Sequence, residues 1–158
     1  MTGEPEEITF PADDRVELVA GMSKLATVRK GWVNISPVLP EGVEPPRQGI
    51  LAYLGARGPE ALLATWVPGV AKGDGFEPTK VGLQHSAGKR VVNRLAEGGL
   101  AIPEGWKVTQ DHPARGVVAI VDDGADLDEV AAWLIAAAER VATSPLTGRW
   151  RATFYRQE

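Results

Sequence analysis

The stretch from Asp126 to about Ala142 constrains the fold more than any other part of the sequence, because its two ends and its interior all indicate a helix. Asp126 can cap a helix, since its carboxylate accepts hydrogen bonds from the free N–H groups of the first turn. Asp128 and Glu129 follow in that turn, where the positive end of the helix dipole favours acidic side chains. Pro145 blocks an extension of the helix. The sequence therefore predicts its clearest helix in this stretch.

Shorter apolar runs, bounded by turn residues, predict strands and two earlier helices. The helices are expected from Asp13 or Asp14 to about Lys30, where Gly31 ends the first, and from Ala87 to about Glu97, with Ser86 as the cap. The expected strands cover residues 8–10, 32–38, 49–56, 61–67, 80–84, 106–110, 116–121 and 149–155, of which 49–56 and 61–67 form a hairpin. These elements predict an α+β fold with a mixed, mostly antiparallel sheet packed by about three helices. Their expected order is β-α-β-β-β-β-α-β-β-α-β.

Length and composition predict one domain. The chain has 158 residues, of which 44% are hydrophobic and 24% charged, as is usual for a globular protein. Residues 1–7 are expected to form a flexible acidic tail, and residues 68–79 a flexible glycine-rich loop.

Several classes of function are excluded or disfavoured by composition. The chain contains no cysteine, which excludes disulfides, thiolate metal sites, iron–sulfur clusters and cysteine nucleophiles. It shows neither a signal-peptide pattern nor an apolar run long enough to cross a membrane. We therefore expect a cytoplasmic protein, and the residue usage suggests a bacterial source. The net charge of −4 makes nucleic acid an unlikely partner.

The segment from Gly82 to Arg90 superficially resembles a phosphate-binding loop. One residue too many separates Gly82 from Gly88, and Arg90 stands where the motif needs Ser or Thr, so the motif is rejected. A weaker anion site is left open, in which Ser86, Gly88, Lys89 and Arg90 hold an anion at the predicted helix start. The alternative, which is favoured, is an ordinary helix cap with a solvated first turn.

The two histidines are candidates for ligand binding. His85 and His112 both follow predicted strands, and Asp111 precedes His112 and has the chemistry to orient an imidazole base. The favoured interpretation is a pair of surface or turn histidines. We expect no catalytic residues, no metal site and no cofactor. The acidic cluster at residues 122–129 lacks the order of a calcium loop and is better explained by turns and caps.

Five tryptophans are many for a chain of this length. Trp32, Trp66 and Trp150 lie near the ends of predicted strands and are candidate anchors for a protein interface. A core position for each is the favoured alternative, since indole rings bury a large apolar area.

Without its first, middle and last short strands, the predicted order becomes α-β-β-β-α-β-β-α. The last two thirds carry this pattern through the helix containing Asn93, the loop Leu100–Pro103, the strands from Trp106 and Gly116, and the helix after Asp126. The order resembles the secretion-chaperone-like fold of type III secretion chaperones and of the YbjN-type bacterial regulators. That resemblance implies a dimeric, non-catalytic domain whose sheet edges or apolar grooves bind another polypeptide.

The leading expectation is therefore a non-enzymatic, cytoplasmic domain that binds a protein or peptide, as a homodimer. The alternative is a small-ligand-binding protein or an enzyme that acts on an anionic, phosphorylated substrate. In that case His85, Lys89 and Arg90 would contact the substrate, together with His112.

Overall fold

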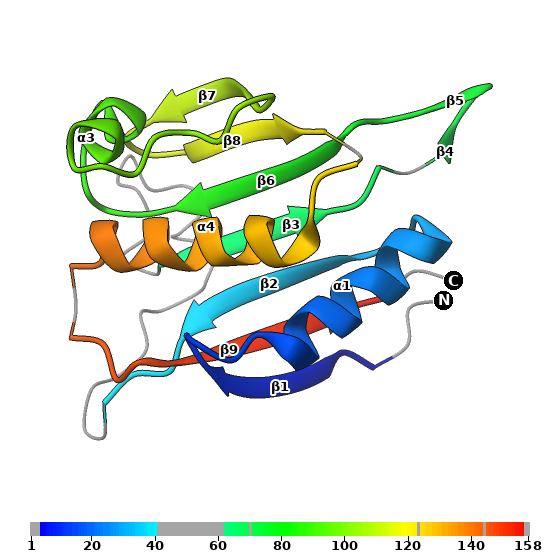
Figure 1. The fold of residues 1–158 in the computed structure, drawn as a ribbon, viewed down its shortest axis with the longest axis horizontal. Helices are drawn as coiled ribbons and strands as arrows, with labels where there is room; N and C mark the ends of the chain where they lie inside the picture. Colours follow the sequence, from blue (N-terminus) through cyan, green and yellow to red (C-terminus); the bar gives the residue numbers. More distant parts are fainter. Residues whose placement is uncertain (1–3, 41–61, 70, 123, 144, 157–158) are drawn as a thin grey trace.

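A computed structural model describes residues 4–40, 62–69, 71–122, 124–143 and 145–156 of the chain. Within these ranges the chain forms three helices and a seven-stranded antiparallel sheet, together with a small two-stranded hairpin (Figure 1). The helices are α1 (Val16–Val28), α3 (Val91–Glu97) and α4 (Leu127–Val141). The sheet strands are β1 (Glu6–Pro11), β2 (Trp32–Pro37), β3 (Leu63–Val67), β6 (Thr79–Gln84), β7 (Lys107–His112), β8 (Gly116–Val121) and β9 (Arg149–Tyr155). The hairpin consists of β4 (Ala71–Lys72) and β5 (Gly75–Phe76).

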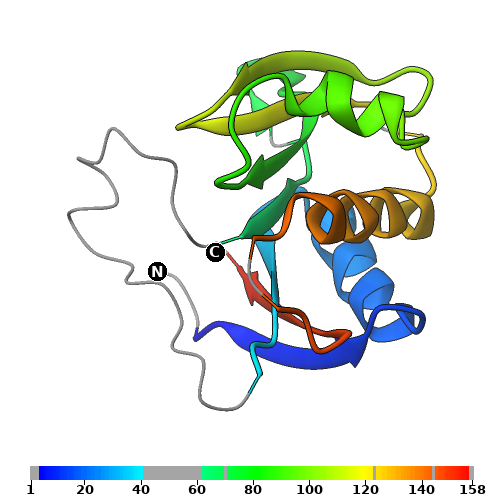
Figure 2. The ribbon, with the colours of Figure 1, turned by 90° about the vertical axis from the view of Figure 1, so that its left-hand side faces the viewer.

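The sheet brings the two ends of the chain together at one edge. Its order is β1-β9-β2-β3-β6-β8-β7, so that the last strand, β9, lies between the first two. All three helices cover the same face, as the edge-on view in Figure 2 shows. The opposite face, called the open face below, carries a polar row in which Thr65 Oγ1 donates to Asn34 Oδ1 at 2.8 Å.

The core lies between this sheet and the helices. Cross-strand pairing aligns Phe154, Val33, Trp66, Val81 and Ala119 in one row on the helix-covered face. All five side chains are buried, because α1 and α4 cover them. The buried side chains that the two helices contribute include Leu18, Met22, Leu25, Leu134 and Ile135. Successive side chains along a strand point to opposite faces of the sheet, and this alternation produces the arrangement.

The structure confirms the predicted fold class and most of the elements. The predicted bounds of β8 and β9 agree with the structure, and residues 8–10 lie in edge strand β1. Asp126 caps α4 as predicted, since its Oδ1 accepts from the N–H groups of Asp128 at 2.9 Å and Glu129 at 3.2 Å.

Three local predictions need correction, and a fourth falls outside the described residues. The glycine-rich segment 68–79 contains the β4–β5 hairpin, with Gly73 at its turn in a left-handed conformation. The acidic tail is shorter than predicted, because Glu6 and Glu7 already pair with β9. Helix α1 ends before Gly31: Arg29 is its left-handed C-cap, at φ 54°, and Gly31 has a positive φ of 85° two residues later. The predicted strand 49–56 lies outside the described residues, and within the described sheet β3 pairs with β2 and β6.

The start of the second helix was also predicted too early. Helix α3 begins at Val91, because Gly88 and Arg90 both have left-handed backbone angles, with φ of 89° and 57°. Such angles interrupt the right-handed helix, so Ser86 does not cap α3. Its hydroxyl instead lies 3.1 Å from the hydroxyl of Thr143, beyond the end of α4.

Candidate functional site

A pocket lies at one end of the helix-covered face, between the last turn of α1, the first turn of α4 and the neighbouring ends of three strands. Its volume is about 120 Å³. The lining residues come from distant parts of the sequence: Ala26, Arg29, Trp66, Pro68, Gly69, Thr79, Val121, Asp122, Ala125, Leu127 and Val130. Most of these side chains are apolar, and the polar groups are few. That combination is typical of sites that bind a small group in a fixed orientation.

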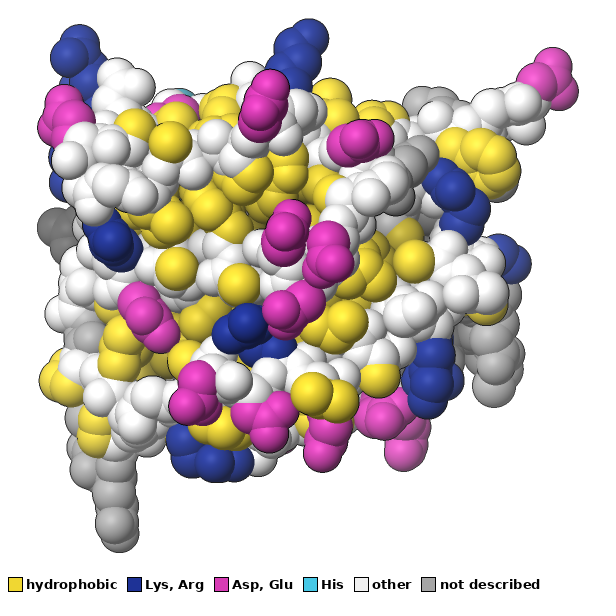
Figure 3. All heavy atoms as spheres, in the orientation of Figure 1, with side chains coloured by type: hydrophobic (Ala, Val, Ile, Leu, Met, Phe, Trp, Pro, Cys, Tyr) yellow, Lys and Arg dark blue, Asp and Glu magenta, His cyan; other side chains and the backbone are white. Residues whose placement is uncertain are grey.

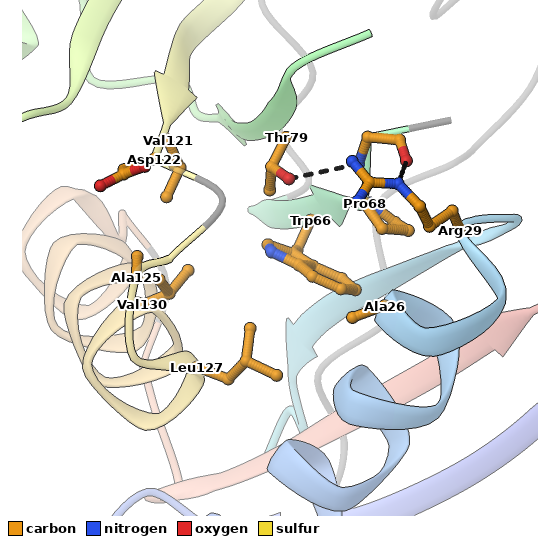
Figure 4. A pocket seen from close by; sticks show the side chains of 11 residues that line it. Ala26, Arg29, Trp66, Pro68, Thr79, Val121, Asp122, Ala125, Leu127 and Val130 are labelled. Carbon is orange, nitrogen blue, oxygen red and sulfur yellow. Dashed lines mark hydrogen bonds between the residues drawn. The ribbon is translucent and has the colours of Figure 1, made fainter. Parts of the chain in front are cut away.

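Gly69 forms one wall of the pocket and is held on both sides. Its N–H donates to Thr79 Oγ1 at 3.2 Å, and its carbonyl accepts from Arg29 Nε at 2.8 Å (Figure 4). A Cβ atom at this position would lie 2.2 Å from the backbone oxygen of Glu77. Only glycine therefore lets the chain after β3 approach the segment before β6 this closely.

Arg29 connects this wall to the β4–β5 hairpin. It follows α1, and its backbone N–H donates to the carbonyl of Leu25 at the end of the helix. Its guanidinium lies 4.0 Å from the centre of the Phe76 ring, a geometry in which a cation is attracted to an aromatic face. The Phe76 ring is 60% exposed.

Trp66 lies across the middle of the pocket, with the nitrogen-bearing edge of its ring turned toward Val121 and Val130 (Figure 4). It is 1% exposed, because it occupies the central row of the sheet between Val33 and Val81. Its indole N–H is buried and has no hydrogen-bond partner among the described residues. A buried donor without a partner is costly, and such groups often mark a place where a ligand or water supplies the acceptor.

His85, a predicted ligand residue, is buried rather than accessible. It is 1% exposed at the end of β6, and its Nδ1 accepts from the Ala87 N–H at 3.1 Å. Because Nδ1 is the acceptor, the neutral ring carries its proton on Nε2, which is buried and has no partner among the described residues. Burial lowers the pKa of His85 below its usual value, and the nearby Asp111 carboxylate opposes this effect.

The predicted anion site is arranged differently from the expectation. Lys89 and Arg90 are exposed before α3, but the carboxylate of Asp111 already accepts from the Val92 N–H at 3.1 Å. The Arg94 guanidinium donates to the carbonyl of Ala87. At this helix start, the Asp111 carboxylate thus already accepts from a backbone N–H, and the Arg94 guanidinium already donates to a backbone carbonyl.

His112 lies away from His85. Asp111 pairs with buried Val117, so the next residue, His112, points to the open face, whereas His85 points to the helix-covered face. The exposed His112 ring accepts from the N–H groups of Ala114 at 3.0 Å and Arg115 at 3.1 Å. The structure therefore places Asp111 near His85 rather than at the ring of His112, and it places His112 at the end of β7, where its ring accepts hydrogen bonds from the turn that follows.

The three tryptophans considered as interface anchors differ in position. Trp66 and Trp150 are each 1% exposed and belong to the core. Trp32 is half-buried on the open face, where its ring stacks on Tyr155 with 4.9 Å between centroids. Among the three, only Trp32 retains a surface that another protein can contact.

The acidic residues near α4 are used within the fold. Asp122 accepts from the Gly124 N–H at 3.4 Å, and Asp128 forms a 2.9 Å ion pair with Arg15. In the described part of the chain, no three acidic or histidine side chains are grouped so that they could hold a metal ion.

The pocket residues other than Trp66 were not identified from the sequence. Arg29 and Thr79 belong to no motif, and neither does Phe76, which contacts Arg29 outside the pocket; the three come close only because the end of α1, the hairpin and β6 converge. The one sequence signal was the high glycine content of residues 68–79, which includes Gly69.

Comparison of the chain with protein-family models, curated proteins and solved structures found no match. Of the helices described, none has the length and apolar character needed to cross a membrane. Function therefore has to be inferred from the residues of the site itself.

Proposed function

We propose that this chain is a non-catalytic domain that binds a short segment of another polypeptide. The binding surface, called the hairpin-end surface below, consists of Val28, Phe76 and the mouth of the pocket. The observation that carries the proposal is the exposed Phe76 ring, which lies against Arg29, a residue that lines the pocket. Aromatic rings fixed next to a pocket are typical anchors of protein interfaces.

The distribution of exposed hydrophobic side chains supports this location. Among the described residues, three large hydrophobic side chains are strongly exposed: Val16 at 74%, Val28 at 60% and Phe76 at 60%. Two of the three are close to Arg29: Val28 directly precedes it in the sequence, and the Phe76 ring contacts it. Figure 3 shows hydrophobic side chains at the base of the hairpin and again beside the first turn of α4. Grouped apolar exposure of this kind marks interaction sites.

The edges of the sheet offer less support for strand addition by a partner. Edge strand β1 carries Glu6 and Glu7 and ends at Pro11, and edge strand β7 is irregular between Val108 and Gln110. Charges, proline and bulges at an edge oppose pairing with a further strand. A groove-and-pocket mode fits the described surface better than β-augmentation.

The alternative of an anionic substrate at His85, Lys89 and Arg90 gains no support from the geometry. His85 is buried, and Asp111 places a negative charge where such a substrate would bind. We therefore retain the polypeptide-binding proposal alone.

Selection from a random displayed peptide library, with the full chain as the target, tests the proposal. Enriched peptides should bind the full chain and lose about tenfold or more in affinity on Phe76→Ser or Val28→Ser. Val16→Ser is the matched control, because Val16 is a strongly exposed valine at the other end of α1. Affinity should be unchanged in that variant.

Two results would overturn the proposal: no enrichment of any peptide, or enriched peptides that bind the Phe76 and Val28 variants as well as the original chain. The mass of the free chain in sedimentation tests whether the partner is a second copy. A dimer that dissociates on Phe76→Ser but not on Val16→Ser would show that this surface binds a second copy of the chain and not a segment of another protein.

A further inference from the structure

We propose that the open face of the sheet binds a single strand of nucleic acid. The phosphates of the strand contact basic side chains on this face, and its bases contact the stacked rings of Trp32 and Tyr155 and the backbone at Gly82. The inference goes beyond the proposed function, because it concerns the side of the sheet opposite the helices (Figure 2). Within the described ranges, no helix lies on that side.

The charge of the open face is opposite in sign to that of the whole chain. Among the described residues of the seven-stranded sheet, pairing and alternation place one acidic side chain on this face, that of Glu7. They place four basic side chains there, those of Lys80, Lys107, Arg149 and Arg151. The chain has a net charge of −4, so the acidic residues lie mainly elsewhere, as over the first turn of α4 in Figure 3. The net charge that disfavoured nucleic acid therefore does not describe this face, where the local excess of cations attracts a polyanion.

These four cations are accessible to phosphates. Lys80 and Lys107 are exposed, and neither forms an ion pair with another described residue. Arg151 pairs with Glu7 at 3.1 Å, but the two side chains are 44% and 56% exposed, and a surface pair of this kind is weak and screened by salt. Arg149 donates to a neutral hydroxyl group at 3.3 Å.

The aromatic pair lies in line with two of the cations. Cross-strand register aligns one row on the open face: Tyr155, Trp32, Val67, Lys80, Ile120 and Lys107. From β9 to β7 this row crosses five strand spacings, or roughly 24 Å. The Trp32 and Tyr155 rings stack with 4.9 Å between centroids, and both residues are half-buried, so each retains some exposed surface. Bases of any sequence stack on aromatic rings, while cations along the same surface contact the phosphates.

Gly82 leaves a dip near the centre of the open face. It lies within β6, between Thr65 of β3 and Val118 of β8. Packing does not require glycine here, because a Cβ would meet only the Val117 carbonyl oxygen, at an ordinary 3.7 Å. The backbone does not require it either, since Gly82 is not among the residues with positive φ. Glycine weakens the interior of a strand and often marks a place where a ligand approaches the backbone closely.

The row that contains Gly82 carries neutral polar side chains and no carboxylate. Its members are Thr153, Asn34, Thr65, Gly82, Val118 and Gln110. Amide and hydroxyl groups can donate to and accept from the edges of unpaired bases. An acidic peptide would use the cations of this face but not its stacked rings, so a single strand of nucleic acid fits the face better.

Fluorescence anisotropy of labelled oligonucleotides of about ten nucleotides, with the full chain at low salt, tests the proposal. The probes are one mixed sequence as single-stranded RNA, as single-stranded DNA and as a duplex. A single strand should bind about tenfold more tightly than the duplex, because paired bases cannot reach the rings. The tighter of the two single strands identifies the polymer.

Charge variants locate the site. Lys80→Glu and Lys107→Glu should each weaken binding about tenfold. Each should also reduce the slope of log affinity against log salt by about 0.7, the value for one lost phosphate contact. Lys24→Glu is the matched control, because Lys24 is an exposed lysine of α1, on the other side of the sheet. Its affinity and salt slope should stay close to those of the original chain.

Two uncharged substitutions test the rings and the dip. Trp32→Leu removes a stacking surface and should weaken binding about tenfold. Gly82→Thr fills the dip with a side chain that favours strands, so binding should weaken about tenfold while stability in urea is kept or raised. A purely structural role for Gly82 would give the reverse, a loss of stability with no direct effect on affinity.

The proposal is overturned if neither single strand binds, if the duplex binds as tightly, or if Lys24→Glu weakens binding as much as Lys80→Glu does. Unchanged affinity in a folded Gly82→Thr variant would also overturn it, because no ligand would then lie across the centre of the open face. Polyglutamate, added as a competitor, tests the other occupant. If it displaces the labelled strand as effectively as the unlabelled strand does, the face binds an acidic polypeptide and not nucleic acid.

Discussion

Arg29 lies 4.0 Å from the centre of the Phe76 ring and joins two segments that are far apart in the sequence. Its Nε also donates to the carbonyl of Gly69, at 2.8 Å. One side chain thus connects the end of α1, the chain that leaves β3 and the β4–β5 hairpin. The exposed hairpin and the wall of the pocket therefore depend on the same residue.

This contact predicts a measurable coupling between Arg29 and Phe76. In a double-mutant cycle with Arg29→Ala and Phe76→Ala, the two changes should be non-additive by about 0.5–1 kcal/mol in the free energy of unfolding. The reason is that either change alone already removes the attraction between the cation and the ring. Urea denaturation of the four proteins measures the coupling, and strictly additive values would show that the contact contributes nothing in solution.

A Cβ atom at Gly69 should destabilise the protein. In Gly69→Ala, the added methyl group would meet the Glu77 carbonyl oxygen at 2.2 Å, so the backbone has to move apart. We expect a loss of about 2 kcal/mol in the free energy of unfolding, as for other overpacked sites. Gly75→Ala is the control, since a Cβ there has no atom within 4 Å. Equal losses in both variants would show that the close approach at Gly69 does not exist.

His85 should make the stability of the protein depend on pH. Burial lowers the pKa of His85 in the folded state below its value in the unfolded chain, so the unfolded chain binds the additional proton first. A proton on Nδ1 would also face the Ala87 N–H, which now donates to that atom. The contribution of His85 is fully present above its ordinary pKa of 6.5, and stability should fall as the pH drops below that value.

His85→Asn tests this dependence, because the Asn side chain has an oxygen positioned to accept from the Ala87 N–H and does not titrate. The free energy of unfolding, measured by denaturation across the pH range, should fall less steeply on acidification in this variant. The control is His112→Asn, at an exposed position at the end of β7, which should keep the steep dependence of the original chain. The reverse result, with the slope lost in His112→Asn, would contradict the assignment to His85.

Elements with strong local signals were predictable. The cap of α4 follows from the chemistry of the Asp126 side chain, which acts on the next three residues. The bounds of β8 follow from its run of apolar residues, and those of β9 from its alternation of apolar and polar residues; turn residues precede both strands. In each case the determining contacts lie within a few residues along the chain.

Features that depend on contacts between distant segments were not predictable. The pocket needs Arg29, Trp66, Thr79 and Val121 to meet at one end of the sheet, and no spacing along the chain encodes that meeting. The burial of His85 likewise depends on the register of β6 against β8, which decides the face to which the ring points. A histidine next to a serine and a basic pair can therefore resemble a ligand site and still belong to the interior.

Arginine in a left-handed conformation is a further feature without a sequence signal, and at Arg90 it leads to a stabilising substitution. This residue is exposed and has φ of 57°, a conformation that costs a side chain about 1 kcal/mol or more and that glycine adopts freely. Arg90→Gly should raise the free energy of unfolding by about 0.5–1 kcal/mol, and the melting temperature should rise with it. Lys89→Gly is the matched control: Lys89 is equally exposed but has no positive φ, so glycine there brings only additional freedom to the unfolded chain and should destabilise the protein slightly. A loss of stability in Arg90→Gly would instead show that the Arg90 side chain makes contacts worth more than the backbone strain, and would return attention to this residue as part of a binding site.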